Sequence, residues 1–136
     1  MELLNIRKAF EKSLKELNSD IDTAYENVKY EPRSNVPYQR LQLAPNQVQN
    51  PTIGDNYYRE EGEFQVFLCY PTHIGTSDVL TKAHLIRDSY YRGLTLVEGG
   101  TEIIISETPR IDGAIITNER YIVPVIIKYF ASVLKA

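Results

Sequence analysis

The segment Leu94-Thr-Leu-Val-Glu-Gly-Gly-Thr-Glu-Ile-Ile-Ile-Ser106 decides the fold. Its central Gly99-Gly100 pair is typical of a two-residue hairpin turn, in which both residues adopt positive φ angles. Such a turn pairs Leu96 with Ile103 on one face of the hairpin. Because that face is then uniformly apolar, the register of the two strands is well specified. The segment therefore predicts an antiparallel hairpin that is buried on one side.

Two longer segments, one on each side of this hairpin in the chain, also predict strands. Glu63–Tyr70 carries apolar side chains on both faces, which is typical of a central strand. Tyr121–Phe130 is apolar on both faces as well, so we expect either that helices cover one face and a neighbouring subunit the other, or that the sheet is sandwiched within the chain. Within it, Pro124 has no N–H to donate and predicts a local edge or bulge. Shorter strands are predicted at 24–28, 38–43 and 115–116.

Apolar residues three or four positions apart predict two helices. The first lies at the amino terminus and has the stripe Leu3, Ile6, Phe10, Leu14, Leu17 and Ile21. A stop is expected at Asn18-Ser19-Asp20, because Asn tolerates the left-handed conformation that often ends a helix. The second is expected at Ser77–Tyr90, capped by Thr76 or Ser77, with the buried stripe Val79, Ala83, Ile86 and Tyr90.

The order helix, strands, helix, strands predicts an α+β fold. We expect a mostly antiparallel, twisted sheet packed against an N-terminal helix and a second, central helix. A chain of 136 residues fits a single domain, 1–136. Residues 44–61 are polar and contain two prolines and a glycine, which predicts a long loop. Residues 131–136 are expected to form a C-terminal extension.

Composition excludes several classes of protein. The chain is 43% hydrophobic and 24% charged, as globular proteins are, and its net charge is -3. This mild acidity predicts solubility and gives no general attraction to nucleic acid or to anionic lipid. No apolar run reaches the roughly 18 residues of a membrane helix, and the first residues do not resemble a secretion signal. A soluble, cytoplasmic protein with no membrane partner is expected.

Candidate groups for catalysis or metal binding are few. His84 and Asp88 are four residues apart on the second helix and His73 lies upstream, but this spacing matches no standard metal site. Cys69 is the only cysteine and lies in the middle of a predicted strand, where a thiol usually acts as a small buried apolar group. The sequence therefore predicts no metal site and no catalytic nucleophile.

Other reactive motifs are also missing. The chain contains no glycine-rich phosphate loop and no nucleophile elbow. Three carboxylates, Glu60, Glu61 and Glu63, flank Arg59, and a solvated, self-compensating patch explains them better than acid–base catalysis. The arginines are scattered among acidic neighbours, which argues against specific nucleic-acid binding. We expect a protein that is not an enzyme and that needs no cofactor.

Tyrosine is the unusual feature of the composition, with 10 residues and no tryptophan. Tyr and Arg are enriched at protein–protein interfaces because they combine a large contact area with a polar tip. Tyr57-Tyr58-Arg59 lies in the predicted loop, and Tyr91-Arg92 follows the second helix. We therefore predict interface roles for Tyr57, Tyr58, Arg59, Tyr91 and Arg92, although tyrosines that merely edge the core remain an alternative.

An ordered set of short segments resembles the tail-terminator-like proteins of tailed bacteriophages and prophages. It runs through about residues 1–130 and comprises Asn5-Ile6-Arg7, Ala24-Tyr25-Glu26-Asn27-Val28, Pro37-Tyr38-Gln39-Arg40, Asn50-Pro51-Thr52-Ile53-Gly54-Asp55-Asn56-Tyr57-Tyr58-Arg59-Glu60, Tyr70-Pro71, Ile86-Arg87-Asp88, Arg92-Gly93, Thr108-Pro109 and Tyr121-Ile122-Val123-Pro124-Val125. No single segment is diagnostic by itself.

The resemblance implies a structural protein that assembles with itself into a ring, commonly a hexamer. Such a ring caps the tail tube, stops its polymerisation and offers the surface to which the head attaches. The implied partners are the major tail-tube protein and a head-completion or neck protein, and DNA passes through the ring without specific binding. The implied location is the virion tail, and the bacterial cytoplasm during assembly.

Two alternatives stay open at this point. The chain is alternatively a head–neck connector, a stopper or another minor tail protein, which is also a phage protein but acts at a different position in the particle. A small host enzyme or ligand-binding domain would use Cys69, His73 or His84.

Overall fold

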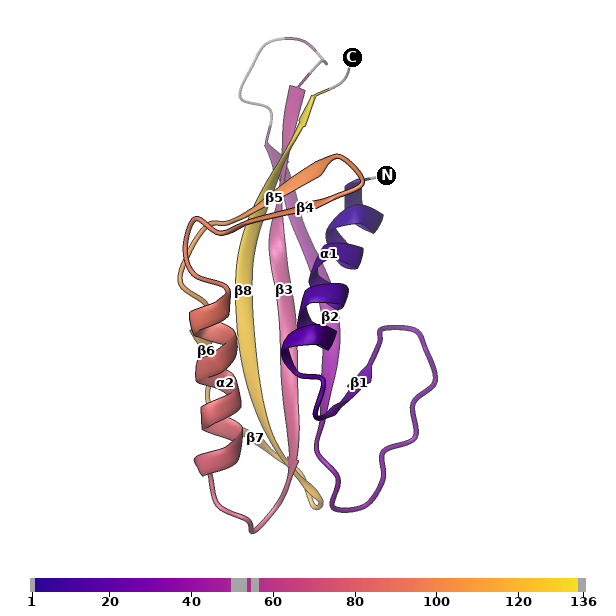
Figure 1. Ribbon diagram of the computed structural model, residues 1–136, viewed down its shortest axis with the longest axis vertical. Helices are drawn as coiled ribbons and strands as arrows, with labels where there is room; N and C mark the ends of the chain where they lie inside the picture. Colours follow the sequence, from indigo (N-terminus) through magenta and orange to yellow (C-terminus); the bar gives the residue numbers. More distant parts are fainter. Residues whose placement is uncertain (1, 50–53, 55–56, 135–136) are drawn as a thin grey trace.

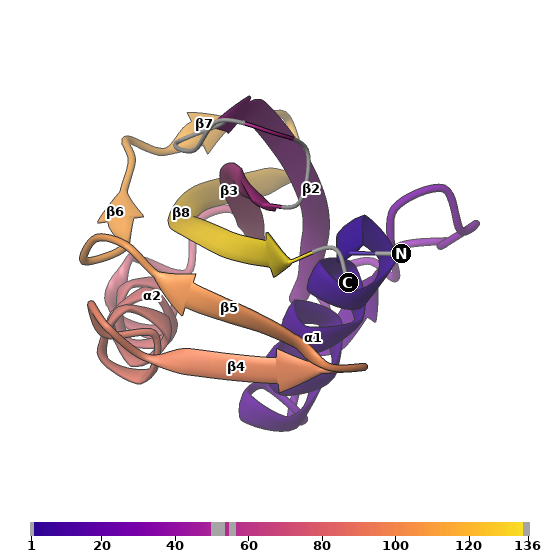
Figure 2. The ribbon, with the colours of Figure 1, turned by 90° about the horizontal axis from the view of Figure 1, so that it is seen from above.

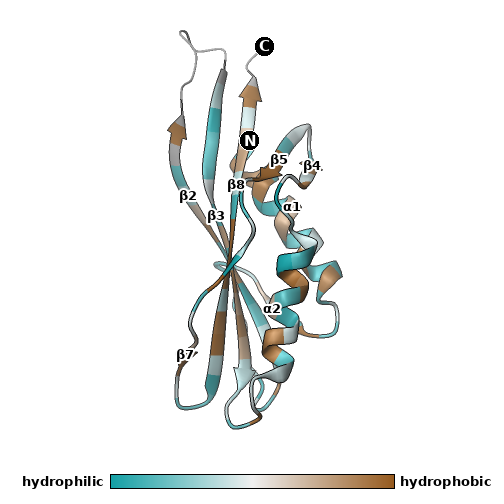
Figure 3. Ribbon diagram, turned by 90° about the vertical axis from the view of Figure 1, so that its left-hand side faces the viewer, coloured by the Kyte–Doolittle hydropathy of each residue, from teal (hydrophilic) through white to brown (hydrophobic). Residues whose placement is uncertain are grey.

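The computed structural model describes residues 2–49, 54 and 57–134, and places two helices on one side of a curled sheet (Figures 1 and 3). The elements of this part of the chain are α1 (Glu2–Leu17), β1 (Asp22–Ala24), β2 (Tyr38–Gln49), β3 (Tyr57–Pro71), α2 (Ser77–Ser89), β4 (Thr95–Glu98), β5 (Thr101–Ile105), β6 (Arg110–Ile111), β7 (Ile115–Ile116) and β8 (Arg120–Leu134). The fold is α+β, as predicted.

The sheet is antiparallel except for the pair β1–β2, and its strand order is β1-β2-β3-β8-β5-β4. β5 pairs with only part of one edge of β8, and two short strands, β6 and β7, pair with the rest of that edge. The sheet curls strongly, and α1 lies across the opening between its two ends (Figure 2). The tip of the β4–β5 hairpin contacts α1, where Asn5 Nδ2 donates to Thr101 Oγ1 at 3.0 Å.

The β4–β5 hairpin confirms the register predicted from its sequence. Leu96 is paired with Ile103, and Ile103 is fully buried. Gly99 and Gly100 both have positive φ angles, +57° and +82°, as the two-residue turn requires. A local turn signal and a uniformly apolar face thus fix this element.

The loop predicted at 44–61 is wrong at both ends, and residues 50–53 and 55–56 in its middle lie outside the described residues. β2 continues to Gln49, and β3 begins at Tyr57. The pairing of β2 with β3 shifts in register between Pro45 and Val48, which lets the strand continue past the proline. Residues 131–134, expected to be an extension, belong to β8 and pair with the start of β3. Both errors have one cause: β3 pairs with β2 and with β8, and pairing between segments distant in sequence is not visible locally.

The other elements are confirmed with shifted ends. α1 stops at Leu17, just before the predicted stop, and Ile21 lies outside it. β1 comprises Asp22–Ala24 instead of 24–28. α2 begins at Ser77 as expected, but Thr76 makes no side-chain capping hydrogen bond.

Pro124 lies inside the sheet, in the register opposite Phe67. Its carbonyl accepts from the backbone N–H of Asp112 at 3.0 Å, at the end of β6. Because the N and C=O of a strand residue point to the same neighbour, the missing donor faces the break between β6 and β7. The predicted local edge is therefore present, although the strand itself is central.

The core lies between the helices and the inner face of the sheet, with Phe10 of α1 at its centre. The Phe10 ring stacks on Phe64 at 4.7 Å and contacts the rings of Tyr90 and Tyr129 at 6.0 and 5.6 Å. All four residues are buried. Burial of a large apolar side chain contributes about 1.5–3 kcal/mol, so this cluster fixes both helices against the sheet.

A buried polar cluster fixes the end of α1 against the sheet. Asn18, directly after the helix, donates from Nδ2 to Gln39 Oε1 at 2.8 Å, and both side chains are fully buried. Gln39 Nε2 in turn donates to the Leu14 carbonyl at 3.2 Å and to Thr23 Oγ1 at 3.0 Å. The first is a second hydrogen bond to a carbonyl that also accepts from the Asn18 backbone N–H at 3.0 Å, and the second connects β1 to β2.

Candidate interaction surfaces

Tyr58 and Arg59 lie in the strand β3, so their side chains point to opposite faces of the sheet. The Tyr58 hydroxyl donates to the Glu2 carboxylate at the start of α1, and this hydrogen bond lowers the pKa of Glu2. Tyr58 therefore faces the helices. The side chain of Tyr57 lies outside the described residues.

Arg59 lies on the outer face of the sheet, which is turned away from the helices. Its guanidinium stacks on the Phe130 ring, 4.1 Å from the ring centroid, and reaches Glu61 at 3.8 Å. The registers place four residues in one row across the strands, in the order Thr95, Ile104, Phe130 and Glu61. Arg59 thus covers Phe130 in this row, next to Ile104, and the row ends at the carboxylate of Glu61.

More acidic residues surround this row. Glu102 is exposed beside Ile104, on the strand position opposite Val97, which is 65% exposed. Glu63 is paired in register with Lys128, and the Lys128 amino group lies 3.6 Å from the Glu107 carboxylate. We call this surface the outer patch; it comprises Arg59, Glu61, Glu63, Val97, Glu102, Ile104, Glu107, Lys128 and Phe130. Four acidic residues and two basic ones give it a net negative charge.

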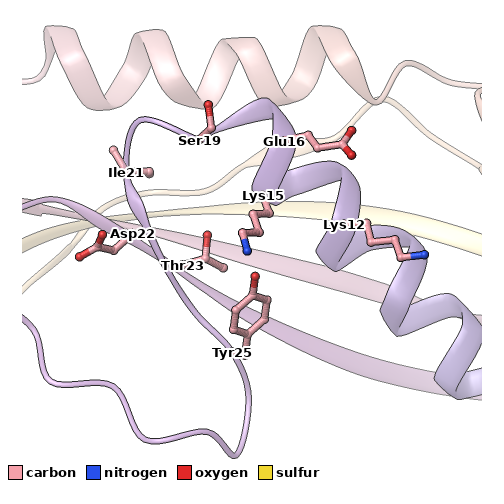
Figure 4. Close-up of a pocket in the computed structure, with 8 residues that line it drawn as sticks. All are labelled: Lys12, Lys15, Glu16, Ser19, Ile21, Asp22, Thr23 and Tyr25. Atoms are coloured by element: carbon pink, nitrogen blue, oxygen red, sulfur yellow. The ribbon is translucent and has the colours of Figure 1, made fainter.

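A hollow of about 660 Å³ runs between α1 and the segment that carries β1 (Figure 4). In Figure 4 the Lys15 amino group lies over the hydroxyl of Tyr25, and Ile21 and Thr23 form the opposite side. A second hollow of about 540 Å³ shares Lys12, Lys15 and Tyr25 with the first and extends along α1. The two form one open groove, which is lined by three lysines and Arg7 and by four carboxylates, Glu11, Glu16, Asp22 and Glu26.

The lysines of this groove form one stripe on the helix. Lys8, Lys12 and Lys15 are exposed and are spaced four and three residues apart, so they share the solvent side of α1. We call these three residues the lysine stripe. The Lys12 amino group lies 2.8 Å from the Glu98 carboxylate, whereas Lys8 and Lys15 have no ion pair among the described residues. The stripe therefore presents positive charge to solvent.

Tyr91 and Arg92 are both exposed in the turn between α2 and β4, and Tyr91 is 57% exposed. They belong to a different part of the molecule from Tyr58 and Arg59, which lie at the start of β3 (Figure 1). The structure thus distributes the predicted interface residues over separate surfaces. Their role in an interface stays a prediction.

The three residues of the enzyme hypothesis lie in different environments. Cys69 is buried on β3, and burial raises the pKa of its thiol, which disfavours the reactive thiolate. His73 and His84 are exposed in the loop before α2 and on α2. Within residues 2–49, 54 and 57–134, no three His, Cys, Asp or Glu residues are arranged to hold a metal ion.

Sequence reasoning missed the outer patch and the lysine stripe. The spacing of Lys8, Lys12 and Lys15 was visible, but mixed charges along the helix hid it. Phe130 and Ile104 come from strands that are distant in sequence, and only the registers of β5, β8 and β3 bring them beside Arg59. Residues that become neighbours only through strand pairing, as Arg59, Phe130 and Ile104 do, leave no pattern in the local sequence.

These features define an α+β protein whose distinctive groups lie on open surfaces of a curled sheet and a covering helix. Residues 5–129 match the family model of the phage tail terminator protein, which is most of the chain. The chain therefore belongs to the phage tail terminator family. No curated protein matched the sequence.

Solved structures show the same fold. One solved chain is 24% identical in sequence, with a TM-score of 0.75 over 96% of this chain and 96% of its own length. At this identity the likeness extends to the fold alone.

Membership of the family makes this chain a structural protein of the phage tail, located in the virion tail and in contact with other tail components. The family is structural rather than catalytic. In the described part of the chain, no helix has both the length and the apolar composition needed to cross a membrane.

Proposed function

We propose that this protein caps the tail tube as a ring of identical subunits, most simply a hexamer. The ring stops polymerisation of the tube and provides the surface to which the head is joined. Its partners are the major tail-tube protein on one side and a head-completion or neck protein on the other. The observation that carries the proposal is the family match over residues 5–129.

The surfaces of the monomer support an assembly role. The outer patch combines apolar side chains with charged ones, which is the composition of interfaces between proteins that also exist as separate subunits. At the far end of the sheet, Ile115 and Ile116 of β7 are 50% and 71% exposed, and they offer a second apolar surface. A ring subunit needs several such surfaces, because each copy contacts two neighbours and the structures above and below.

A cap acts by occupying the end of a growing polymer. Once the ring covers the last disc of tail-tube protein, the surface for the next disc is replaced by a surface of different shape and charge. No bond needs to form or break. Assembly takes place in the host cytoplasm, and DNA passes through the finished ring without specific contacts, because the chain lacks the excess of Lys and Arg that phosphate binding requires.

The test is polymerisation of purified tail-tube protein in the presence of this protein. We expect electron microscopy to show a ring at one end of each tube and a mean tube length that falls as the proportion of this protein rises. Rings found only on isolated portal or neck proteins would instead identify a head–neck connector. Unchanged tube lengths with no decoration of either partner would contradict the proposal.

A further inference from the structure

The lysine stripe and the outer patch lie on opposite sides of the molecule. The stripe lies on the solvent side of α1, whose other side packs on the inner face of the sheet through Phe10 and Phe64. The outer patch lies on the face of the same sheet that is turned away from the helices. The two surfaces therefore face different directions and approach each other at the tip of the β4–β5 hairpin, where Lys12 of the stripe lies 2.8 Å from Glu98, the neighbour of Val97.

Each surface carries charge that its own subunit does not neutralise. On the outer patch, Arg59 and Lys128 contact Glu61 and Glu107, which leaves Glu63 and Glu102 without an ion pair among the described residues. On the groove, the described ion pairs leave Lys8 and Lys15 unpaired, and Glu16 is the one rim acid without an ion pair; the whole lining is balanced, with four basic and four acidic side chains. The outer patch is thus negative, whereas the positive charge of the second surface is confined to the lysine stripe.

Both surfaces also offer apolar area. The outer patch has Phe130, Ile104 and the 65% exposed Val97. The groove has Ile21, Tyr25 and the 60% exposed Val28. A negative patch and a positive lysine stripe, each beside apolar side chains on one chain, suit a head-to-tail contact, which closes into a ring when the rotation between neighbours allows it.

We propose that the subunit contact of the ring is formed by the outer patch of one copy and the lysine stripe, with its groove, of the next. This inference rests on the proposed ring and adds the surfaces that build it. The charges set the orientation and the pairing of the copies, and the apolar side chains supply the area that is removed from water. The occupant of the groove is a second copy of this chain.

The experiment uses two charge-reversal variants of the full chain. The first is Lys8→Glu/Lys15→Glu and the second is Glu63→Lys/Glu102→Lys. Because these four side chains make no ion pair within the described part of the subunit, their reversal leaves its internal ion pairs intact. Native mass spectrometry and sedimentation, with tube ends present if rings form only there, measure assembly. We expect each variant alone to assemble at least tenfold more weakly than the wild type.

A 1:1 mixture of the two variants gives the sharper result. Each stripe then faces an outer patch of opposite charge, so we expect assembly to return, with alternating subunits and even-numbered rings only. Glu119→Lys, which lies outside both surfaces and makes no ion pair in the described part of the chain, serves as a control and should assemble like the wild type. Circular dichroism checks folding, and the neutral variant Glu63→Gln/Glu102→Gln should weaken assembly in the same direction if the reversed one folds poorly.

The outcomes separate this inference from the proposed function. Rings that survive both reversals, or folded variants whose mixture stays monomeric, would overturn the assigned contact and leave the ring untouched. If the reversals weaken only attachment to the tube, the groove holds the tube protein and the inference is wrong. A wild type that is monomeric alone and on tube ends would overturn the ring and this contact together.

Discussion

Gly62 and Tyr129 show how one residue of β3 makes room for another of β8. They are paired in register, and a Cβ on Gly62 would lie 2.6 Å from the Tyr129 hydroxyl oxygen and 2.9 Å from the Ala44 carbonyl oxygen. The absence of a side chain at Gly62 lets the Tyr129 ring lie along the strand and reach Phe10 in the core.

We predict that Gly62→Ala destabilises the fold by about 1–3 kcal/mol, the usual cost of overpacking a tight site. The backbone oxygen of Ala44 cannot move aside as a flexible side chain can, so relaxation is limited. The free energy of unfolding from urea denaturation measures the effect. An alanine variant as stable as the wild type would show that β2 shifts freely at this point.

Tyr129 provides the matched comparison at the same site. Its hydroxyl is buried and has no hydrogen-bond partner in the described part of the chain. Replacing it by Phe removes an unsatisfied buried polar group, which is neutral or stabilising. We therefore expect Tyr129→Phe to keep or raise the urea midpoint and to relieve part of the cost of Gly62→Ala. A marked loss of stability in Tyr129→Phe would reveal a partner for this hydroxyl.

The elements differ in how far the sequence predicted them. The β4–β5 hairpin and both helices follow from local signals: a Gly-Gly turn, an alternating strand and a stripe with a helical period. The residues of 44–61 look like a loop because Pro, Asn and Gly are frequent there. Their strands exist because β3 pairs with β2 and with β8, and pairing partners distant in sequence leave no local pattern.

The candidate site was predicted only in part, for the same reason. The sequence identified Tyr58 and Arg59 as unusual, but a loop assignment gives no relation between their directions. Once the segment is a strand, alternation sends Tyr58 to Glu2 and the helices, and Arg59 to Phe130 and the outer patch. The directions of the Tyr58 and Arg59 side chains follow only once the segment is known to be a strand, and its polar, proline-containing composition predicts a loop instead.

We predict that alanine substitutions at Arg59 of β3 and at Ile86 of α2 change the free energy of unfolding by different amounts. Ile86 is fully buried, so Ile86→Ala should lower the free energy of unfolding by about 2–5 kcal/mol. The Arg59 side chain is 39% exposed and stacks on Phe130, and loss of such a contact costs about 0.5–1 kcal/mol. Arg59→Ala should instead weaken ring formation, because it removes contact area from the middle of the outer patch, even though the patch then becomes more negative.

Urea denaturation and native mass spectrometry on the same preparations measure this contrast. Leu14→Ala is the matched control on α1, since Leu14 is fully buried as well. If Arg59→Ala unfolds as readily as Ile86→Ala and assembles normally, the residue is part of the core and not of an interface.

At the scale of the whole molecule, stability depends on tyrosines that stay neutral. Burial raises the pKa of Tyr90 and of Tyr129 to about 12 each, and both rings contact Phe10. The pKa of tyrosine in an unfolded chain is about 10. Between these values the folded protein holds more protons than the unfolded one, so the free energy of unfolding falls as the pH rises.

We predict that the stabilisation from these two neutral phenols is fully present below about pH 10 and is lost progressively between about pH 10 and 12. Urea midpoints measured across this range, together with the ultraviolet absorbance of ionised tyrosine, check the prediction. Tyr129→Phe should make the decline shallower, because one of the two phenols no longer ionises on unfolding. A midpoint that stays constant up to pH 12 would show that both hydroxyls are accessible in the folded state.

β3 and β8, each 15 residues long and antiparallel, run side by side from one end of the molecule to the other (Figure 1). A force that pulls the two strands along their length in opposite directions acts on all of their interstrand hydrogen bonds at the same time, instead of breaking them one after another. In the ring that we propose, a subunit held at both ends would carry load along these two strands.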